Sequence, residues 1–209
     1  MSEIFVSTHP LVLHDLSILR DRETQPPAFR AALHRVALTL LHTATADLPT
    51  RKIIVQTPLE SAEGLTLRVR VGLAPILRAG LGMVPAGLEI LPMAEVWHLG
   101  FYRDETTLQP VKYYSPLHRG RPLPEVMFLL DPMLATGGSA VAAITELKRH
   151  GARQIKFIGV LAAPEGIARV REAHPDVHIY LAAVDRALNE QGYILPGLGD
   201  AGDRQFGTA

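Results

Sequence analysis

The stretch Val126–Ala140 constrains the fold more than any other part of this chain. Val126–Leu130 is an unbroken apolar run of strand length between two prolines, which is typical of a strand buried in a parallel sheet. Asp131 follows it, and a small glycine-containing turn at Ala135–Ser139 leads into a helical pattern. Because the first backbone N–H groups of a helix have no partner within it, this strand, turn and helix predict an anion-binding site.

The turn differs from two common nucleotide-binding loops. It has neither the Gly-x-x-x-x-Gly-Lys-Ser/Thr pattern nor the Gly-x-Gly-x-x-Gly pattern. Gly137 and Gly138 allow a phosphate to approach the backbone, and the hydroxyls of Thr136 and Ser139 add donors. A carboxylate ahead of such a cradle suits a ligand with a diol and a terminal phosphate, namely a ribose 5-phosphate. For Gly-Gly-Ser alone, a tight strand-to-helix turn without a ligand is the alternative interpretation.

Apolar strand patterns alternate with helical patterns along most of the chain. Strands are predicted at 53–57, 67–71, 73–77, 94–100, 155–163 and 177–184, and helices at 16–22, at 28–46 and after residues 82, 139 and 164. This alternation predicts an α/β fold with an open, mostly parallel, twisted sheet flanked by helices. Ligands bind such sheets at the carboxyl ends of the strands, which is where Arg78 follows the strand at 73–77.

Composition excludes several classes of protein. The 21 basic residues balance the 21 acidic ones, so no overall field favours nucleic acid or an acidic membrane. Cysteine is absent, which excludes disulfides, a thiol nucleophile and the usual structural zinc ligands. The first residues lack the order of a signal peptide, and no apolar run approaches the roughly 20 residues that span a bilayer. We therefore expect a cytoplasmic protein.

Two further segments have an unusual composition. Residues 101–123 are polar and interrupted by prolines, and a loop this long in a compact domain is usually functional or mobile. Residues 188–204 contain several glycines and a proline, which predicts neither a regular helix nor a regular strand. Apolar side chains between those glycines are nevertheless unusual for a disordered tail.

Three of these stretches resemble motifs of the uracil phosphoribosyltransferases, which are type I phosphoribosyltransferases. Asp-Pro-Met-Leu-Ala-Thr-Gly-Gly-Ser at 131–139 resembles their loop for phosphoribosyl diphosphate (PRPP). Pro-Ile-Leu-Arg-Ala-Gly at 75–80 resembles the turn that holds the diphosphate. Gly-Tyr-Ile-Leu-Pro-Gly-Leu-Gly-Asp-Ala-Gly-Asp at 192–203 resembles their uracil-binding segment.

The resemblance implies the fold of that family, with a C-terminal hood and a β-arm or flexible loop. The expected parts of a single domain over 1–209 are N-terminal helices at 10–47, a core at about 50–185, the arm at about 101–123 and the uracil-binding hood at about 186–209. The stretch 102–113 resembles the family's arm over the active site. Thr107 and Gln109 stand there in place of the acids of the family pattern, which puts acidic regulatory contacts of the arm in doubt.

The resemblance also implies a reaction and the residues for it. Uracil and PRPP would give UMP and diphosphate in pyrimidine salvage, with Mg²⁺ as cofactor. The expected catalytic residues are Arg103, Asp131 and Asp200, and the backbone at Ile194, Gly199, Asp200 and Ala201 would bind uracil. The expected PRPP ligands are Arg78, Arg103, Asp131, Pro132, Met133, Leu134, Ala135, Thr136, Gly137, Gly138, Ser139 and Asp200. The metal would be held through PRPP, with Asp200 contacting it through water.

The family habit and the apolar helix at 28–46 indicate a homodimer or higher homo-oligomer, with GTP as a candidate effector. Neither nucleic acid nor a membrane is expected as a partner. Three alternatives remain: an RNA-binding regulator of the pyrimidine-operon type on the same fold, a catalytically idle domain of the kind fused to uridine kinases, and a transferase for another base. The neutral overall charge disfavours the RNA-binding regulator, and the absence of a kinase P-loop disfavours the idle domain. The segment at 193–203 disfavours another base.

Overall fold

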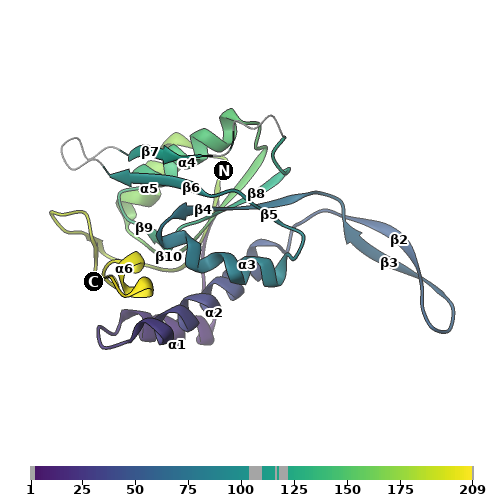
Figure 1. Cartoon of the computed structure of the whole chain (residues 1–209), viewed down its shortest axis with the longest axis horizontal. Coiled ribbons are helices and arrows are strands. Elements are labelled where there is room, and N and C mark those ends of the chain that lie inside the picture. Colours follow the sequence, from purple (N-terminus) through teal and green to yellow (C-terminus); the bar gives the residue numbers. More distant parts are fainter. Residues whose placement is uncertain (1–2, 104–109, 116, 118–121, 209) are drawn as a thin grey trace.

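A nine-stranded sheet forms the centre of the computed structural model, which describes residues 3–103, 110–115, 117 and 122–208 (Figure 1). The path through the sheet runs β1 (Ile4–Val6), β11 (His178–Val184), β10 (Gln154–Ala162), β8 (Val126–Leu130), β4 (Val71–Leu77), β6 (Leu99–Arg103) and β7 (Pro110–Tyr114). Two short strands lie off this path, β5 (Glu95–Val96) beside β4 and β9 (Met133–Leu134) beside β10. Within the described part of this sheet, every pairing is parallel except β6 with β7, so the predicted α/β fold with a mostly parallel sheet is confirmed.

β8 lies at the middle of the sheet, between β10 and β4, and all five of its residues are buried. Its side chains alternate between the two faces. Phe128 joins one hydrophobic cluster, whereas Met127 and Leu129 join the other. The prediction of a buried parallel strand at 126–130 is therefore confirmed, and its unbroken apolar run reflects burial on both faces.

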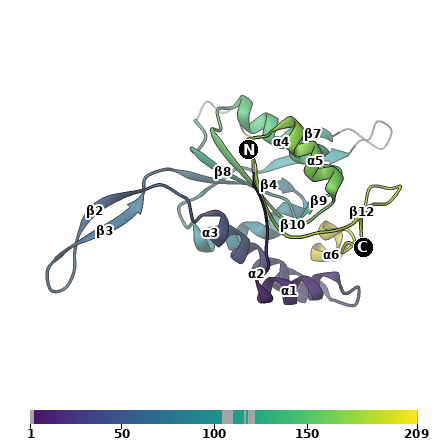
Figure 2. The same cartoon turned by 180° about the vertical axis from the view of Figure 1, so that it is seen from behind.

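Helices cover both faces of the sheet. α1 (Pro10–Arg20), α2 (Pro26–Ala44) and α3 (Val84–Ile90) cover one face, and α4 (Gly138–Arg149) and α5 (Pro164–Ala173) cover the other (Figures 1 and 2). A 3-10 helix, Ala79–Met83, connects β4 to α3. The site residues that follow β4 and β8 are thereby carried by strands that are packed on both sides.

The first helix differs from its predicted range of 16–22. It begins at Pro10, where the His9 side chain caps it by accepting the Leu11 N–H (3.2 Å), and it ends at Arg20. A proline lies in the first turn, where its missing N–H costs nothing. The second helix, α2, lies close to its predicted range of 28–46.

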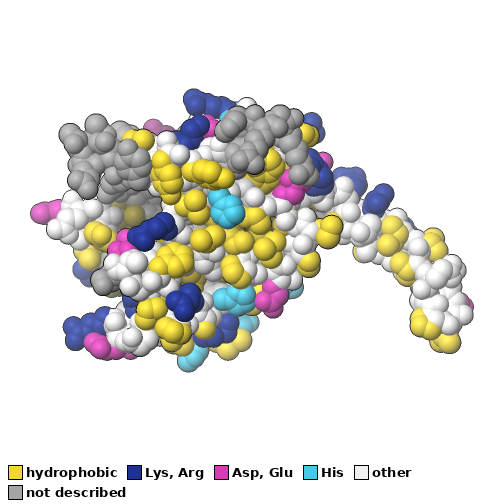
Figure 3. Space-filling model, in the orientation of Figure 1, with side chains coloured by type: hydrophobic (Ala, Val, Ile, Leu, Met, Phe, Trp, Pro, Cys, Tyr) yellow, Lys and Arg dark blue, Asp and Glu magenta, His cyan; other side chains and the backbone are white. Residues whose placement is uncertain are grey.

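β2 (Thr50–Gln56) and β3 (Ser61–Leu67) form an antiparallel hairpin that projects from the body of the molecule (Figure 3). The predicted strand at 67–71 is wrong, because Leu67 ends one strand and Val71 begins another. Leu67 pairs with Thr50, whereas Val71 pairs with Val126 in the central sheet. The hairpin thus lies outside the sheet, which β1 joins from the N-terminus.

The predicted strand at 94–100 divides into β5 and β6. Between them the Trp97 N–H bonds to the Leu73 carbonyl oxygen (2.8 Å). The predicted arm at 101–123 begins as the antiparallel pair β6–β7. Residues 104–109 between these strands, which include Thr107 and Gln109, lie outside the described residues, as do 116 and 118–121. Among the helices that the structure describes, none is long and apolar enough to cross a membrane.

The C-terminal segment 186–208, which we call the hood, contains regular elements that its composition did not predict. β12 (Ala187–Leu188) pairs with β13 (Ile194–Leu195), and α6 (Ala201–Phe206) follows. α6 forms because the Asp200 carboxylate accepts the Asp203 N–H at its start and Gly207 adopts a φ of 69° at its end. The expectation that no helix forms up to residue 204 is therefore wrong.

Candidate active site

A cavity of about 380 Å³ lies at the carboxyl ends of β4 and β8, between the sheet and the hood. Its lining residues are Ala79, Asp131, Met133–Ala140, Gln191–Ile194 and Gly199–Gly202. One wall is therefore the β8–α4 loop, residues 131–139, and the other is the hood. This is the edge of a parallel sheet at which ligands generally bind.

The β8–α4 loop is fixed to the sheet by its main chain. The Pro132 carbonyl oxygen accepts the N–H groups of Val160 and Leu161 (2.9 Å each), and the Leu134 carbonyl oxygen accepts the Ala163 N–H (3.0 Å). Met133 and Leu134 form β9 against the end of β10. The loop is therefore an extension of the sheet rather than a free connection.

α4 begins where the loop ends. Gly137 is its N-cap at a φ of 75°, a left-handed conformation that favours glycine, and no side chain caps the helix there. Gly166 of α5 packs against the loop, and a Cβ on it would lie 2.4 Å from the Ala135 carbonyl oxygen. The first backbone N–H groups of α4 therefore face a cavity that can hold an anion.

Asp131 follows β8 and is partly buried in the cavity wall. Its carboxylate accepts the Met133 N–H (3.2 Å). Burial raises the pKa of Asp131 to about 7; the Met133 N–H opposes this rise, and the negative charge of Asp200 adds to it. Asp131 thus changes charge near neutral pH, in a cavity with a second carboxylate on its opposite wall.

The hood wall includes several residues with little or no side chain, namely Gly192, Gly199, Ala201 and Gly202. Ile194 and Leu195 form β13, Gly199 has a φ of 80°, and Asp200 and Ala201 begin α6. The Asp200 carboxylate accepts the Asp203 N–H (2.8 Å) and lines the cavity. Peptide N–H and carbonyl groups of this wall can pair with a planar ligand that has both donors and acceptors.

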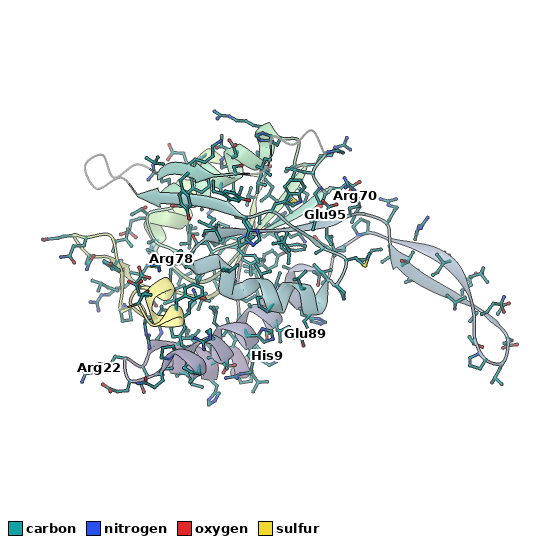
Figure 4. All side chains as sticks on the ribbon, viewed as in Figure 1. His9, Arg22, Arg70, Arg78, Glu89 and Glu95 are labelled. Atoms are coloured by element: carbon teal, nitrogen blue, oxygen red, sulfur yellow. The ribbon has the colours of Figure 1, made fainter. Side chains whose placement is uncertain are left out.

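Arg78 follows β4 and lies beside the hood, outside the residues that line the cavity (Figure 4). Its guanidinium forms an ion pair with the Asp203 carboxylate of α6 (2.7 Å), and the Thr208 hydroxyl bonds to the same carboxylate oxygen (2.7 Å). The hydrogen bonds from Thr208 and Arg78 lower the pKa of Asp203. An anion that reaches Arg78 must therefore replace or share Asp203.

Most of the residues predicted for the site meet at this cavity. Those that line it are Asp131, Met133, Leu134, Ala135, Thr136, Gly137, Gly138, Ser139, Ile194, Gly199, Asp200 and Ala201. Pro132 is buried within the loop and its carbonyl oxygen binds β10, and Arg78 lies at the hood. Arg103 ends β6, and its side chain lies outside the described part of the chain.

Sequence reasoning missed several lining residues, namely Ala79, Ala140, Gln191–Tyr193 and Gly202. All of them are next to predicted ones in sequence, so the motifs themselves were the available signal. Within the described ranges, no group of three or more His, Asp or Glu side chains is placed to hold a metal ion. Asp131 and Asp200 are the carboxylates that line the cavity.

Comparison with known proteins identifies the family. The family model "Uracil phosphoribosyltransferase" matches residues 6–208. A uracil phosphoribosyltransferase of Roseiflexus sp. (strain RS-1) is 55% identical over the full length of both chains. The solved structure of the AQ2163 protein from Aquifex aeolicus has a TM-score of 0.91 and 35% identity, with 99% of each chain covered. The fold is also similar to that of an adenine phosphoribosyltransferase from Thermoanaerobacter pseudethanolicus, with a TM-score of 0.50, 12% identity, and 81% of this chain and 85% of the other covered. The chain belongs to the uracil phosphoribosyltransferase family.

Proposed function

We propose that this protein transfers the phosphoribosyl group of PRPP to uracil, giving UMP and diphosphate in pyrimidine salvage. One observation supports this most directly. A single cavity has a carboxylate and a helix N-terminus on one wall and, on the other, a hood rich in glycine and alanine whose peptide groups can pair with a ligand. The first wall suits a ribose with a terminal phosphate, and the second suits a base.

The chemical difficulty of this reaction is charge. The bond from C1 of the ribose to diphosphate breaks, N1 of uracil bonds to C1, and N1 loses its proton. Positive charge develops on the ring and negative charge on the leaving group, so positioning and electrostatic stabilisation matter more than a covalent nucleophile. We assign the ribose hydroxyls to the Asp131 carboxylate and the 5′-phosphate to residues 135–139.

The arginines complete the PRPP assignment. Arg78 would bind the diphosphate. Its ion pair with the Asp203 carboxylate supports this assignment, because the guanidinium already binds an oxyanion. Arg103 would bind the same group from the arm and exclude water as the arm closes. Pro132 would act by fixing the loop in place, because its carbonyl oxygen accepts two N–H groups of β10.

Base recognition is assigned to the hood. Uracil presents an N–H group and two carbonyl groups, which the backbone at Ile194, Gly199 and Ala201 can match. A site built from such paired donors and acceptors disfavours cytosine, because its amino group would leave a buried partner unpaired. Asp200 stands beside this backbone and would contact PRPP directly or through water.

Magnesium fits the donor set of the cavity. The carboxylates of Asp131 and Asp200 are the oxygen ligands that Mg²⁺ prefers, and the ion usually retains water and substrate oxygens as its other ligands. When bound through PRPP, the ion would neutralise charge on the leaving diphosphate. Asp200 would contact it through water.

We also propose a homodimer or higher homo-oligomer. The β2–β3 hairpin carries exposed apolar side chains along its length, including Leu59 (95% exposed), Leu65 (68%) and Ile54 (66%) (Figure 3). A projecting apolar hairpin of this kind is best covered by another protein surface, and a second copy of the chain is the simplest one. We also propose that the protein is cytoplasmic and that GTP is its effector.

The test is UMP formation from uracil and PRPP with Mg²⁺, in parallel with cytosine, hypoxanthine and orotate. We expect turnover with uracil alone. Retained PRPP binding without turnover on any base would contradict the proposal and favour an RNA-binding regulator on this fold, which an RNA-binding assay at low salt would then examine.

A further inference from the structure

Only part of the hood wall of the cavity is helix or strand. Side chains outside the cavity therefore help to fix its position. Ile194 lines the cavity on one side of Gly197, and Gly199–Ala201 line it on the other. Gly197 does not line the cavity itself, but it lies between these two lining stretches. It has a φ of 66°, and a Cβ on it would lie 2.1 Å from the Ile194 carbonyl oxygen, so the chain turns tightly here.

Arg20 and Asp185 hold both sides of Gly197. The Gly197 N–H donates to Asp185 Oδ2 (2.8 Å), and the Gly197 carbonyl oxygen accepts from Arg20 Nη1 (2.8 Å). The two side chains also bind each other through two hydrogen bonds, of 2.9 Å and 2.6 Å. Together they form a closed ring of charge-assisted bonds around one residue of the hood.

Both residues are anchored in rigid elements. Asp185 directly follows β11, and its own N–H bonds to the Ala162 carbonyl oxygen of β10 (2.8 Å). Arg20 is the last residue of α1, whose C-terminal end lies beside the hood (Figures 1 and 2). The Asp185 side chain is only 5% exposed. Burial alone would raise the pKa of Asp185, but the bonds from Arg20 and Gly197 outweigh it and lower that pKa, so the carboxylate stays charged.

A second arginine supports the adjacent residue from the same direction. Arg204 of α6 donates to the Leu198 carbonyl oxygen (2.7 Å) and to the carbonyl oxygens of Leu19 and Asp21 at the end of α1. Its guanidinium lies over the ring of Phe29 in α2 (4.7 Å). The end of α1 is thus bonded to the hood in two places. Arg20 donates to the Gly197 carbonyl oxygen, and Arg204 connects the Leu198 carbonyl oxygen to those of Leu19 and Asp21.

From this geometry we propose that Arg20 and Asp185 are positioning residues for base recognition. They touch no cavity atom themselves, but they set the place of the backbone groups at Ile194 and Gly199 that would bind uracil. The β8–α4 loop does not depend on them, because main-chain bonds to β10 hold it. The proposal rests on the proposed function, since it concerns the base half of that site.

The test compares three single variants with the unaltered protein. Arg20→Lys keeps the charge, but a single ammonium group cannot span both Asp185 oxygens and the Gly197 carbonyl oxygen as the guanidinium fork does. Asp185→Asn keeps the shape and removes the charge. The matched control is Asp15→Asn, because Asp15 is equally buried at 5% exposed and binds Arg35 of α2 in the same two-pronged way without contacting the hood.

Steady-state kinetics and amide hydrogen exchange are both measured. For Arg20→Lys and Asp185→Asn we expect the KM for uracil to rise by roughly tenfold, with the KM for PRPP within about twofold of the original value. Exchange should accelerate in peptides that cover residues 190–202 and stay unchanged in those that cover 131–140. Asp15→Asn should alter neither the uracil KM nor exchange in the hood.

The outcomes separate the two proposals. An unaltered protein that makes no UMP overturns the proposed function and with it the link to the base. With activity present, an unchanged uracil KM in both variants overturns the positioning role, as does an equal rise of both KM values. A control variant that raises the uracil KM as much as Asp185→Asn would also overturn it, because general destabilisation would then explain the effect.

Discussion

The two walls of the cavity are held in place by different kinds of bond. The β8–α4 loop is bound by peptide groups of the sheet, as in the bonds from Val160, Leu161 and Ala163. The hood is bound through side chains: the Arg20–Asp185 pair from outside it, and its own Arg204 and Gln205, whose amide donates to the Ala79 carbonyl oxygen (2.9 Å). One wall is part of the sheet, and the other is attached to it.

This difference has a consequence for how the two halves of the site respond to mutation. Main-chain bonds survive most substitutions, because every residue type except proline supplies the same peptide group. A wall held by side chains changes whenever one of those side chains changes. We therefore expect the PRPP half to respond mainly to changes at its own residues, at their direct partners or in side chains that clash with its main chain. The base half should also respond to side chains that only hold its backbone from outside the cavity.

The largest effect is expected for Asp131→Asn. The variant loses the negative acceptor proposed for the ribose hydroxyls, and hydrogen bonds to charged groups contribute about 1.5–3 kcal/mol each. The kcat/KM for PRPP should fall about a hundredfold. The KM for uracil, measured at saturating PRPP, should change little. A comparable loss on the uracil side would contradict the division of the cavity into two independently held halves.

A clash behind the β8–α4 loop should have the next largest effect. In Gly166→Ala the new methyl group would meet the carbonyl oxygens of Ala135 at 2.4 Å and Leu134 at 2.6 Å, and main-chain atoms cannot easily move aside. Overpacking costs about 1–3 kcal/mol, so the KM for PRPP should rise by roughly thirtyfold. The control is Gly64→Ala in the hairpin, where φ is not positive and a Cβ would meet side-chain atoms no closer than 3.5 Å. An unchanged PRPP KM would show that the loop is more adaptable than its sheet bonds imply.

The pH dependence of kcat/KM tests the electrostatic interaction between Asp131 on one wall and Asp200 on the other. Burial, with a further contribution from the charge of Asp200, raises the pKa of Asp131 to about 7. The ionised carboxylate is the form that accepts the ribose hydroxyls, so kcat/KM for PRPP should fall as the pH drops through about 7, about tenfold per unit below it. Asp200→Asn removes the neighbouring charge and should shift the midpoint to lower pH. The phosphate groups of PRPP titrate identically with both enzymes, so an unshifted midpoint would rule out the coupling.

The same contrast explains which parts of the molecule could be predicted from sequence. β8, Asp131 and the start of α4 are consecutive, and the apolar run, the carboxylate and the glycines each carry a local signal. The loop wall was therefore predictable almost residue by residue. Pro132 is the exception, since sequence could not show that it is buried and binds β10 through its carbonyl oxygen.

The hood was recognisable only by its resemblance to a family motif. Its main support joins Arg20 to Asp185 across 165 residues, and no pattern in a single sequence reveals such a pair. α6 was missed because glycine content outweighed a local signal that was present, namely Asp200 as an N-cap and Gly207 as a C-terminal stop. The three-residue β1 was missed for another reason, since it is too short for an alternating pattern and forms only against β11.

The smallest effect is expected at the ion pair between Arg78, which follows β4, and Asp203 of α6. This ion pair connects the sheet to the hood. Asp203 competes with diphosphate for the guanidinium, so Asp203→Asn should lower the KM for PRPP by about threefold, a size typical of exposed ion pairs. The Asp203 N–H, which donates to the Asp200 carboxylate that caps α6, remains in this variant. The hood should therefore keep its position, and the uracil KM should not change. Glu63→Gln, which breaks an exposed ion pair with Lys52 in the hairpin, is the matched control. A higher PRPP KM in Asp203→Asn would show the opposite relation, in which Asp203 orients Arg78 for the diphosphate and the hood helps to build the PRPP half as well.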